Sequence, residues 1–262
     1  MPKPSKPWTR EELILAINLY CKTPFGRIHI RNPEIIALAE LLGRTPGSVS
    51  YKLANFAAID PSLPRKGASN VSKLDRATWA EFFADWNGMA FESERLWAER
   101  TGKALGPVAD SGAAAAGAPL LEEDIPLPEG KTREAVVRQR VNQGFFRRAV
   151  LSSYDGACCI TGLAAPELLV GSHIVPWAAD AGNRTNPRNG LCLNVLHDKA
   201  FDRGLIAVDA DFRVVVSPRV RKLGMAGARA VLEVEGAALR MPRRFLPDPA
   251  LLAWHRERVF RG

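Results

Sequence analysis

The segment GSHIVPWAADAGNRTNPRNGLCLNVLHDKAFDRG, residues 171–204, decides the fold of the second half of the chain. It contains two of the four histidines in the sequence, His173 and His197. The run LLVGSHIV is short and β-rich, which predicts a strand that ends near His173. A polar loop follows over residues 176–188, and from Asn189 onward the apolar residues recur at helical spacing. The predicted local order is therefore strand, loop and helix, with one histidine on each outer element.

Helices are predicted throughout the N-terminal part of the chain. A capping-box pattern predicts a helix over about residues 10–22, and an Asn-Pro pair at 32–33 and a Thr-Pro pair at 45–46 predict two more. The last two helices are separated by a turn at Gly43, which gives them the proportions of a helix-turn-helix. A helical hairpin that binds nothing is the alternative. In the helix-turn-helix interpretation, the residues suited to contact phosphates or base edges of DNA are Ser48, Ser50, Tyr51, Lys52 and Asn55.

Residues 72–100 carry aromatic side chains at helical spacing and acidic outer faces. This pattern predicts two helices whose aromatics face a core, in preference to a base-stacking platform. The next stretch, TGKALGPVADSGAAAAGAP, is rich in Gly and Ala and has no periodicity, which is typical of a flexible linker. We therefore divide the chain into a helical DNA-recognition module at 1–100, a linker at 101–120, and a second domain at 121–262 with a basic C-terminal extension.

The charge of the chain favours a polyanionic partner. Lys and Arg outnumber Asp and Glu by 36 to 28, which gives a net charge of +8 and a pI near 9.6. Basic ends flank an acidic middle, so two separate anionic contacts are expected. No signal peptide and no apolar run of about 18 residues is visible, and the four cysteines form no C-x-x-C pair. These features predict a cytoplasmic protein with reduced thiols and no membrane partner.

The second domain begins with a predicted helix that follows a cap at Thr132. This helix has an apolar stripe and an excess of arginine on the opposite face. Such a face can hold phosphates, and a solvated polar surface explains the pattern equally well. The arginines concerned are Arg138, Arg140, Arg147 and Arg148.

The motifs CITGL, LLVGSHIVPW and NPRNGLCLNVLHDKAFDRG resemble the HNH domain of bacterial restriction-like endonucleases. The resemblance is strong over about residues 132–209. It identifies His173, Asn189 and His197 as the three motif residues of a ββα-metal fold. It implies an α+β protein in which a helical N-terminal module with a helix-turn-helix precedes a linker and a C-terminal HNH domain.

Hydrolysis of a phosphodiester needs a base that works near neutral pH, and the pKa of histidine, about 6.5 when unperturbed, suits this task. The resemblance implies that His173 is the general base. It also implies that His197 is a ligand of one divalent ion, Mg²⁺ or Mn²⁺, which neutralises charge on the phosphate. Asn189 is either a second ligand or an orienter of the His173 loop. These three residues form the predicted catalytic set.

Two departures from the family pattern affect the metal. Many members carry Asp or His before the general base, whereas this chain has Ser172, whose hydroxyl is a weaker ligand. Asp198 and Asp202 lie close enough in the sequence to contribute, with salt bridges of the helix and turn as the alternative. The cysteines do not form the paired knuckles that hold zinc in some HNH proteins, so no structural zinc is expected, and Cys159 and Cys192 are expected in the core.

Together these features predict a metal-dependent DNA endonuclease of bacterial restriction or phage defence, with double-stranded DNA as its partner. The alternative is a non-catalytic DNA-binding regulator on a degraded HNH scaffold, which Ser172 keeps open, and an RNase is a third possibility. Cutting both strands with one site per chain would favour a homodimer, although no segment indicates an interface. His29 and His255 are expected to be structural or exposed, and Asn194 is expected on a helix surface.

Overall fold

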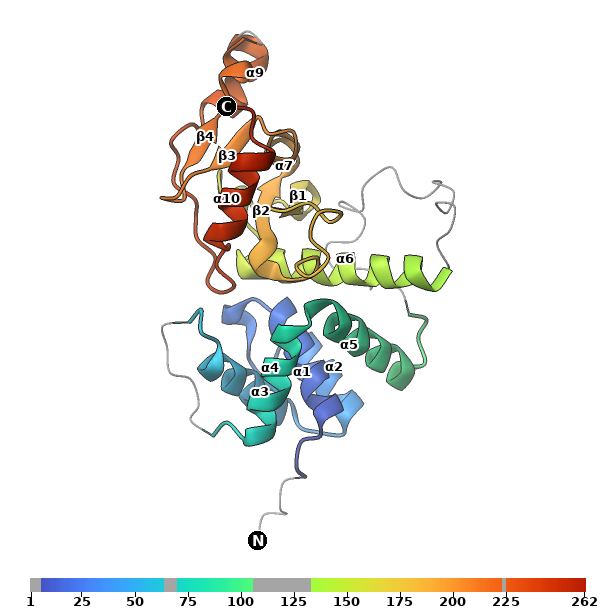
Figure 1. Cartoon of the computed structure of the whole chain (residues 1–262). Coiled ribbons are helices and arrows are strands. Elements are labelled where there is room, and N and C mark those ends of the chain that lie inside the picture. Colours follow the sequence, from blue (N-terminus) through green and yellow to red (C-terminus); the bar gives the residue numbers. More distant parts are fainter. Residues whose placement is uncertain (1–5, 64–69, 106–132, 223–224) are drawn as a thin grey trace. The chain divides into compact units, whose positions relative to one another are not determined.

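The computed structural model describes residues 6–63, 70–105, 133–222 and 225–262. The chain divides into two compact units, Met1–Gly106 and Pro107–Gly262 (Figure 1). Most of the predicted linker and the predicted cap Thr132 lie outside the described residues. No helix within the described ranges combines the length and the apolar character that crossing a bilayer requires.

Helices build the described part of the N-terminal unit, as the sequence predicts. Side-chain caps at Thr9, Asn32 and Thr45 confirm the three predicted helix starts, and Gly43 ends the second helix in the left-handed conformation. A further capping box, at Ser72, begins the fourth helix. The elements are α1 (Arg10–Lys22), η1 (Phe25–Arg27), α2 (Pro33–Leu42), α3 (Pro46–Ile59), α4 (Lys73–Ala84) and α5 (Trp86–Thr101).

Helix α1 is the centre of this unit, because it contacts each of the other four helices. Its side chains Leu13, Ile14 and Ile17 are fully buried. Beside them the rings of Tyr20 and Trp79 meet edge to face, with centroids 5.6 Å apart. The prediction that the aromatics of the 72–100 stretch face a core is confirmed for Trp79, which is buried.

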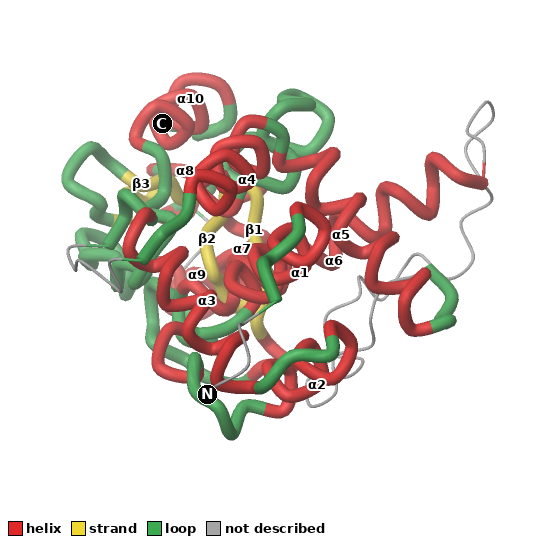
Figure 2. Tube along the Cα trace, turned by 90° about the horizontal axis from the view of Figure 1, so that it is seen from below, coloured by secondary structure: helices red, strands yellow, loops and turns green. Residues whose placement is uncertain are grey.

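Helices and two small antiparallel sheets form the C-terminal unit, so the chain is α+β as predicted (Figure 2). Strand β1 pairs with β2, and β3 pairs with β4. The helices are α6 (Arg133–Ser153), α7 (Val195–Asp202), α8 (Pro218–Arg221), α9 (Met225–Leu232) and α10 (Pro249–Arg258), with short turns η2 (Pro166–Leu168) and η3 (Pro187–Asn189). The strands are β1 (Leu169–His173), β2 (Gly190–Asn194), β3 (Ile206–Val208) and β4 (Val214–Val216).

The second strand corrects the sequence prediction, which began a helix at Asn189. Residues Gly190–Asn194 form β2, which places Gly190 opposite His173, and the helix starts only at Val195. Both α6 and α7 contact β2, so its consecutive residues are buried. A strand covered on both faces is apolar at successive positions, and such a run cannot be distinguished from helical spacing by periodicity alone.

Gly190 allows α6 to cross the hairpin closely. A Cβ atom at this position would lie 2.3 Å from the side chain of Val150 and 3.0 Å from that of Phe146. Contacts below 3 Å are too short for real Cβ atoms, so a larger residue would push α6 away from the sheet. The close crossing brings the Phe146 ring onto the imidazole of His173, at the end of β1.

Helix α10 closes the unit against the end of α7. His255 is buried, its ring stacks on Phe201 at 3.7 Å, and its Nε2–H donates to the carbonyl of Phe201 at 3.1 Å. After α7 the chain turns through Gly204 at φ +66°, where a Cβ would lie 2.0 Å from the carbonyl oxygen of Val259. The expectation that His255 is structural is confirmed by this packing.

Candidate active site

His173 ends strand β1 in the protonation state that a general base requires. Its half-buried ring stacks on Phe146 with a centroid distance of 3.7 Å and meets the Trp177 ring edge to face. Its Nε2 lies 2.9 Å from the carbonyl oxygen of Arg184. Because a carbonyl can only accept, Nε2 carries the proton and Nδ1 has a lone pair. Burial lowers the pKa of His173, so the neutral ring is favoured near pH 7.

Asn189 holds the loop between β1 and β2 together from the inside. The residue is fully buried, and its Oδ1 accepts from the backbone N–H of Val175 at 2.8 Å. Its Nδ2 donates to the carbonyls of Val175 and Asn183 at 3.1 and 3.2 Å. Of the two roles that the sequence left open, the orienter of the His173 loop fits this geometry, and the metal ligand does not.

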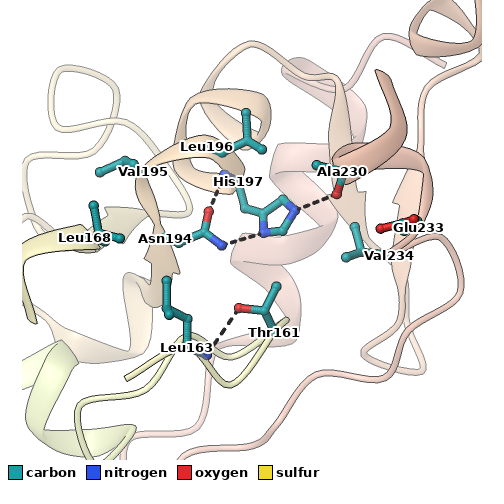
Figure 3. A pocket seen from close by; sticks show the side chains of 10 residues that line it. All are labelled: Thr161, Leu163, Leu168, Asn194, Val195, Leu196, His197, Ala230, Glu233 and Val234. Carbon is teal, nitrogen blue, oxygen red and sulfur yellow. Dashed lines mark hydrogen bonds between the residues drawn. The ribbon is translucent and has the colours of Figure 1, made fainter. Parts of the chain in front are cut away.

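His197 lies in the first turn of α7 but faces inward (Figure 3). It is buried, and its Nε2 lies 3.3 Å from the carbonyl oxygen of Ala230. Asn194 caps α7 by accepting from the His197 N–H at 2.9 Å, and its Nδ2 lies 3.1 Å from Nδ1 of the ring. Since protein groups engage both ring nitrogens, this geometry does not favour His197 as a metal ligand. Asn194 is a helix cap and not simply the surface residue that the sequence suggested.

The hydrogen bonds around His197 extend to a buried cysteine. Burial alone would raise the pKa of the Cys158 thiol, but hydrogen bonds with His197 and Thr161 lower it to about 6. We call Cys158, Thr161, Asn194 and His197 the polar node; it ties the CITG turn to the start of α7.

The node borders a pocket of about 390 Å³ whose other walls are mostly apolar: Leu163, Leu168, Val195, Leu196, Ala230 and Val234, with Glu233 at one side (Figure 3). Cys159 and Cys192 are fully buried in the core, as predicted.

Two carboxylates, Asp198 and Asp202, lie one turn apart on α7, on a different face of the helix from His197. Burial raises the pKa of Asp198, and a contact with the Ser172 hydroxyl opposes that rise. Asp202, one turn later and exposed, has its pKa raised to about 6 by desolvation and by the charge of Asp198. The Oγ of Ser172 is buried and makes no hydrogen bond of ordinary geometry. Ser172, which precedes the general-base candidate in β1, therefore lies against Asp198 of α7.

This arrangement suits a hard divalent cation. A bound cation would offset the desolvation that raises the pKa of both carboxylates and the charge of Asp198 that raises the pKa of Asp202 further, and oxygen atoms are the ligands that Mg²⁺ prefers. Over the described ranges, no three His, Cys, Asp or Glu side chains gather into a metal-binding group. An ion here would take few protein ligands, and water and substrate oxygens would complete its coordination, as is usual for Mg²⁺.

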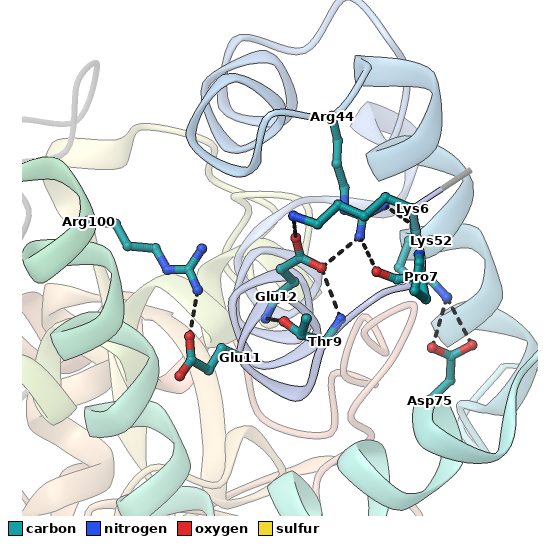
Figure 4. Close-up of polar contacts among 9 residues, drawn as sticks. All are labelled: Lys6, Pro7, Thr9, Glu11, Glu12, Arg44, Lys52, Asp75 and Arg100. Atoms are coloured by element: carbon teal, nitrogen blue, oxygen red, sulfur yellow. Dashed lines mark hydrogen bonds and ion pairs between the residues drawn. The ribbon is translucent and has the colours of Figure 1, made fainter. Parts of the chain in front are cut away.

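The structure corrects two of the predicted DNA contacts on α3. Lys52 is buried and its Nζ donates to both carboxylate oxygens of Asp75, at 2.8 and 2.9 Å (Figure 4). Asn55 is also buried and donates to the carbonyl of Asn70 at 3.2 Å. Both side chains therefore hold α3 to the segment that follows it. Tyr51 is 50% exposed and Ser48 and Ser50 are half-buried, so these three remain available to a partner.

The arginines of α6 differ in exposure. Arg138 and Arg140 are exposed, whereas Arg147 and Arg148 are half-buried. Arg147 donates to the carbonyl of Leu169 at 2.6 Å, so it holds α6 to the start of β1. Their contact with DNA stays a prediction.

Comparison with known proteins identifies the central segment of this unit. Residues 158–209 match the family model described as HNH endonuclease, so the chain carries an HNH endonuclease domain and the resemblance seen in the sequence is confirmed there. A solved structure, "Modification dependent TagI restriction endonuclease", is similar at 21% identity and a TM-score of 0.34, over 44% of this chain and 37% of that chain. The chain thus spans well under half of that protein's length. No curated protein matches the chain.

Proposed function

We propose that the chain is a metal-dependent DNA endonuclease whose HNH domain hydrolyses phosphodiester bonds. One observation carries this proposal: a neutral imidazole at the end of β1 lies next to Ser172, which contacts the half-buried carboxylate of Asp198 on α7. A base and a cation-binding carboxylate on adjacent elements are the two groups that hydrolysis of a phosphodiester requires.

His173 acts as the general base in this proposal. Its Nδ1 takes a proton from water as the water oxygen attacks phosphorus, the bond to the 3′-oxygen breaks, and that oxygen takes a proton from a solvent water. The products then carry a 5′-phosphate and a 3′-hydroxyl. The carbonyl of Arg184 accepts the Nε2–H throughout, so it fixes the tautomer and stabilises the imidazolium that forms. The stacked Phe146 ring fixes the plane of the imidazole.

Asp198, with Asp202, would hold the divalent ion in place of His197 and Asn189. When bound, Mg²⁺ or Mn²⁺ supplies the positive charge that stabilises the scissile phosphate and the leaving oxygen. Ser172 positions Asp198 from the side of β1. His197 keeps a structural role, because its ring anchors the polar node on the other side of the helix.

Double-stranded DNA is the proposed substrate, and restriction or phage defence is the proposed setting. The exposed arginines of α6, Arg138 and Arg140, would contact the phosphate backbone, together with the exposed Tyr51 and the half-buried Ser48 and Ser50 of α3. A homodimer would allow cleavage of both strands. Light scattering of the purified chain, with and without duplex DNA, measures its oligomeric state.

A plasmid-nicking assay in Mg²⁺, in Mn²⁺ and in EDTA tests the proposal. We expect cleavage only with metal, and its loss in His173→Ala and in Asp198→Asn. Glu233→Gln is the matched control, because this exposed carboxylate of the same unit pairs with Arg229 and lies outside the proposed centre. Cleavage in EDTA, or full activity of His173→Ala, would refute the mechanism.

Two other functions give different results in the same assay. A non-catalytic regulator would bind duplex DNA equally in all variants and cut nothing in any metal. An RNase would cut labelled RNA in preference to the plasmid. The regulator was considered because this chain has Ser172 where many family members have Asp or His. In the present proposal Asp198 supplies the carboxylate that this position lacks.

A further inference from the structure

We propose that the loop between α1 and α2, residues 26–31, is the surface through which the N-terminal unit grips the backbone of duplex DNA. The proposal deepens the proposed function, since it takes DNA as the substrate. In this proposal the loop, and not α3, makes the main electrostatic contact between the N-terminal unit and DNA.

Many cations in the described part of the N-terminal unit form ion pairs within it, and Figure 4 shows the pairs of Lys6, Arg44, Lys52 and Arg100. Lys52 is paired with Asp75, and Arg44 binds Glu12 at 2.7 Å while stacking on the Trp8 ring. The other pairs are Lys22 with Glu94, Arg10 with Glu81 and Glu92, Arg95 with Glu99, and Arg100 with Glu11. Such paired cations have little charge left to attract a phosphate.

Helix α3 has no basic side chain left for the backbone of DNA. Lys52 is its only Lys or Arg, and it is buried in the ion pair with Asp75. Phosphate neutralisation by Lys and Arg supplies essentially all of non-specific affinity for DNA and much of the specific affinity. A helix without an available cation can read bases only if other elements provide this attraction, so a basic surface elsewhere in the same unit would serve this purpose.

The loop at residues 26–31 provides this attraction for phosphate. Arg27 and Arg31 are exposed, and neither has an ion pair within the described part of the chain. The stretch from Thr23 to Asn32 contains no Asp or Glu, so no acidic neighbour in the loop opposes them. Between them Ile30 is 57% exposed, the highest value among the exposed large apolar side chains of the described residues. Two arginines around an exposed apolar side chain match the way in which proteins grip a backbone and press against a groove.

The loop is also built rigidly, which favours binding. Asn32 is buried, and its Nδ2 donates to the carbonyl of Arg27 at 2.9 Å. The N–H of Arg27 donates to the carbonyl of Pro24 at 2.8 Å, and the N–H of Asn32 to that of His29 at 3.0 Å. A loop that is already ordered loses less conformational entropy when it binds a ligand.

The start of α4 is the rival surface. Lys73 and Arg76 are exposed there and, like the loop arginines, have no ion pair within the described part of the chain. We favour the loop because it presents two guanidinium groups, which bind phosphate in bidentate fashion, whereas the start of α4 presents one.

Fluorescence anisotropy of the full chain with a labelled duplex in EDTA tests the proposal, with the KCl concentration varied between about 50 and 200 mM. We expect Arg27→Ala/Arg31→Ala to weaken binding by on the order of tenfold at low salt and to lower the salt slope by about two, because two phosphate contacts are lost. Arg27→Glu/Arg31→Glu should weaken it further. Circular dichroism checks that both variants fold, and the backbone hydrogen bonds of the loop do not depend on the replaced side chains.

Arg95→Ala/Arg100→Ala is the matched control, because it removes the same charge from exposed residues that are already paired. Wild-type affinity and slope in the loop variant would overturn the proposal. So would an equal loss in the control, a larger loss in Lys73→Ala/Arg76→Ala, or tighter binding of an RNA duplex than of the DNA.

The nicking assay separates this proposal from the proposed function. If the wild-type chain cuts nothing in any metal but the loop variant still loses duplex binding, the endonuclease proposal fails and the loop proposal stands. If metal-dependent cleavage occurs and the loop variant binds as the wild type does, the loop proposal fails alone.

Discussion

The two units of this protein treat desolvated charge in opposite ways, whether the side chain is fully buried or only partly so. In the N-terminal unit a buried cation faces a buried anion, as in Lys52 with Asp75. In the C-terminal unit the pKa values of Asp198 and Asp202 are both above the ordinary value, for Asp198 because of desolvation and for Asp202 because of desolvation and the charge of Asp198. Breaking a matched buried pair destabilises a fold, whereas carboxylates held together against desolvation are costly to it and are typical of functional sites. This contrast supports the placement of the proposed metal centre on α7.

The largest expected effect comes from removing the unmatched charge. Asp198→Asn should slow cleavage by on the order of 10³-fold, because loss of a metal ligand forfeits several kcal/mol of transition-state stabilisation. The free energy of unfolding should stay the same or rise, since the variant removes a desolvated like charge. Single-turnover cleavage and urea unfolding measure the two quantities. A fully active Asp198→Asn would remove Asp198 from the centre.

Breaking a matched pair should do the reverse. Lys52→Met leaves Asp75 buried without its cation, which should lower the free energy of unfolding of the N-terminal unit by about 3–5 kcal/mol. The exposed pair of Arg95 with Glu99 is the control, and Arg95→Ala should cost less than about 0.5 kcal/mol. Urea unfolding measures both. If Lys52→Met is as stable as the wild type but binds DNA more weakly, then Lys52 contacts DNA, as the sequence predicted.

His255 shows a third treatment of a buried titratable group, because it stays neutral. Burial lowers its pKa from 6.5 to about 4 in the folded chain. Between these values the unfolded chain binds the extra proton, so the contribution of His255 to the free energy of unfolding falls as pH falls from 6.5 toward 4 and is constant above that range. At 1.36 kcal/mol per unit the loss reaches about 3 kcal/mol. Urea unfolding of His255→Leu at pH 7 and pH 4.5 should show a smaller difference than the wild type; an equal difference would contradict the assignment.

The sequence was sufficient for features that depend on a few neighbouring residues. Capping residues placed the helices of the N-terminal unit, and the motif around His173 identified the HNH domain. It was insufficient where the direction of a side chain decides the role. His197 and Asp198 are adjacent in the chain, yet a helix turns successive side chains by about 100°, so one enters the polar node and the other faces β1. Lys52 likewise looked free because its partner, Asp75, lies on another helix.

Variants at the neighbouring residues His197 and Asp198 give the smallest expected change in stability, but they best separate a structural role from a metal-binding role. His197→Ala removes the ring hydrogen bonds to Asn194 and Ala230, which at about 1 kcal/mol each should lower the free energy of unfolding by about 2 kcal/mol. Asn194→Ala is the matched variant, since it removes the cap of the same helix at a cost of about 1 kcal/mol. Both should keep metal-dependent cleavage at a temperature where they are folded, whereas Asp198→Asn, on the next residue, should not. If His197→Ala is instead as stable as the wild type and cuts on the order of 10³-fold more slowly, then the metal ligand is the histidine, and the unmatched carboxylates of α7 belong to the fold.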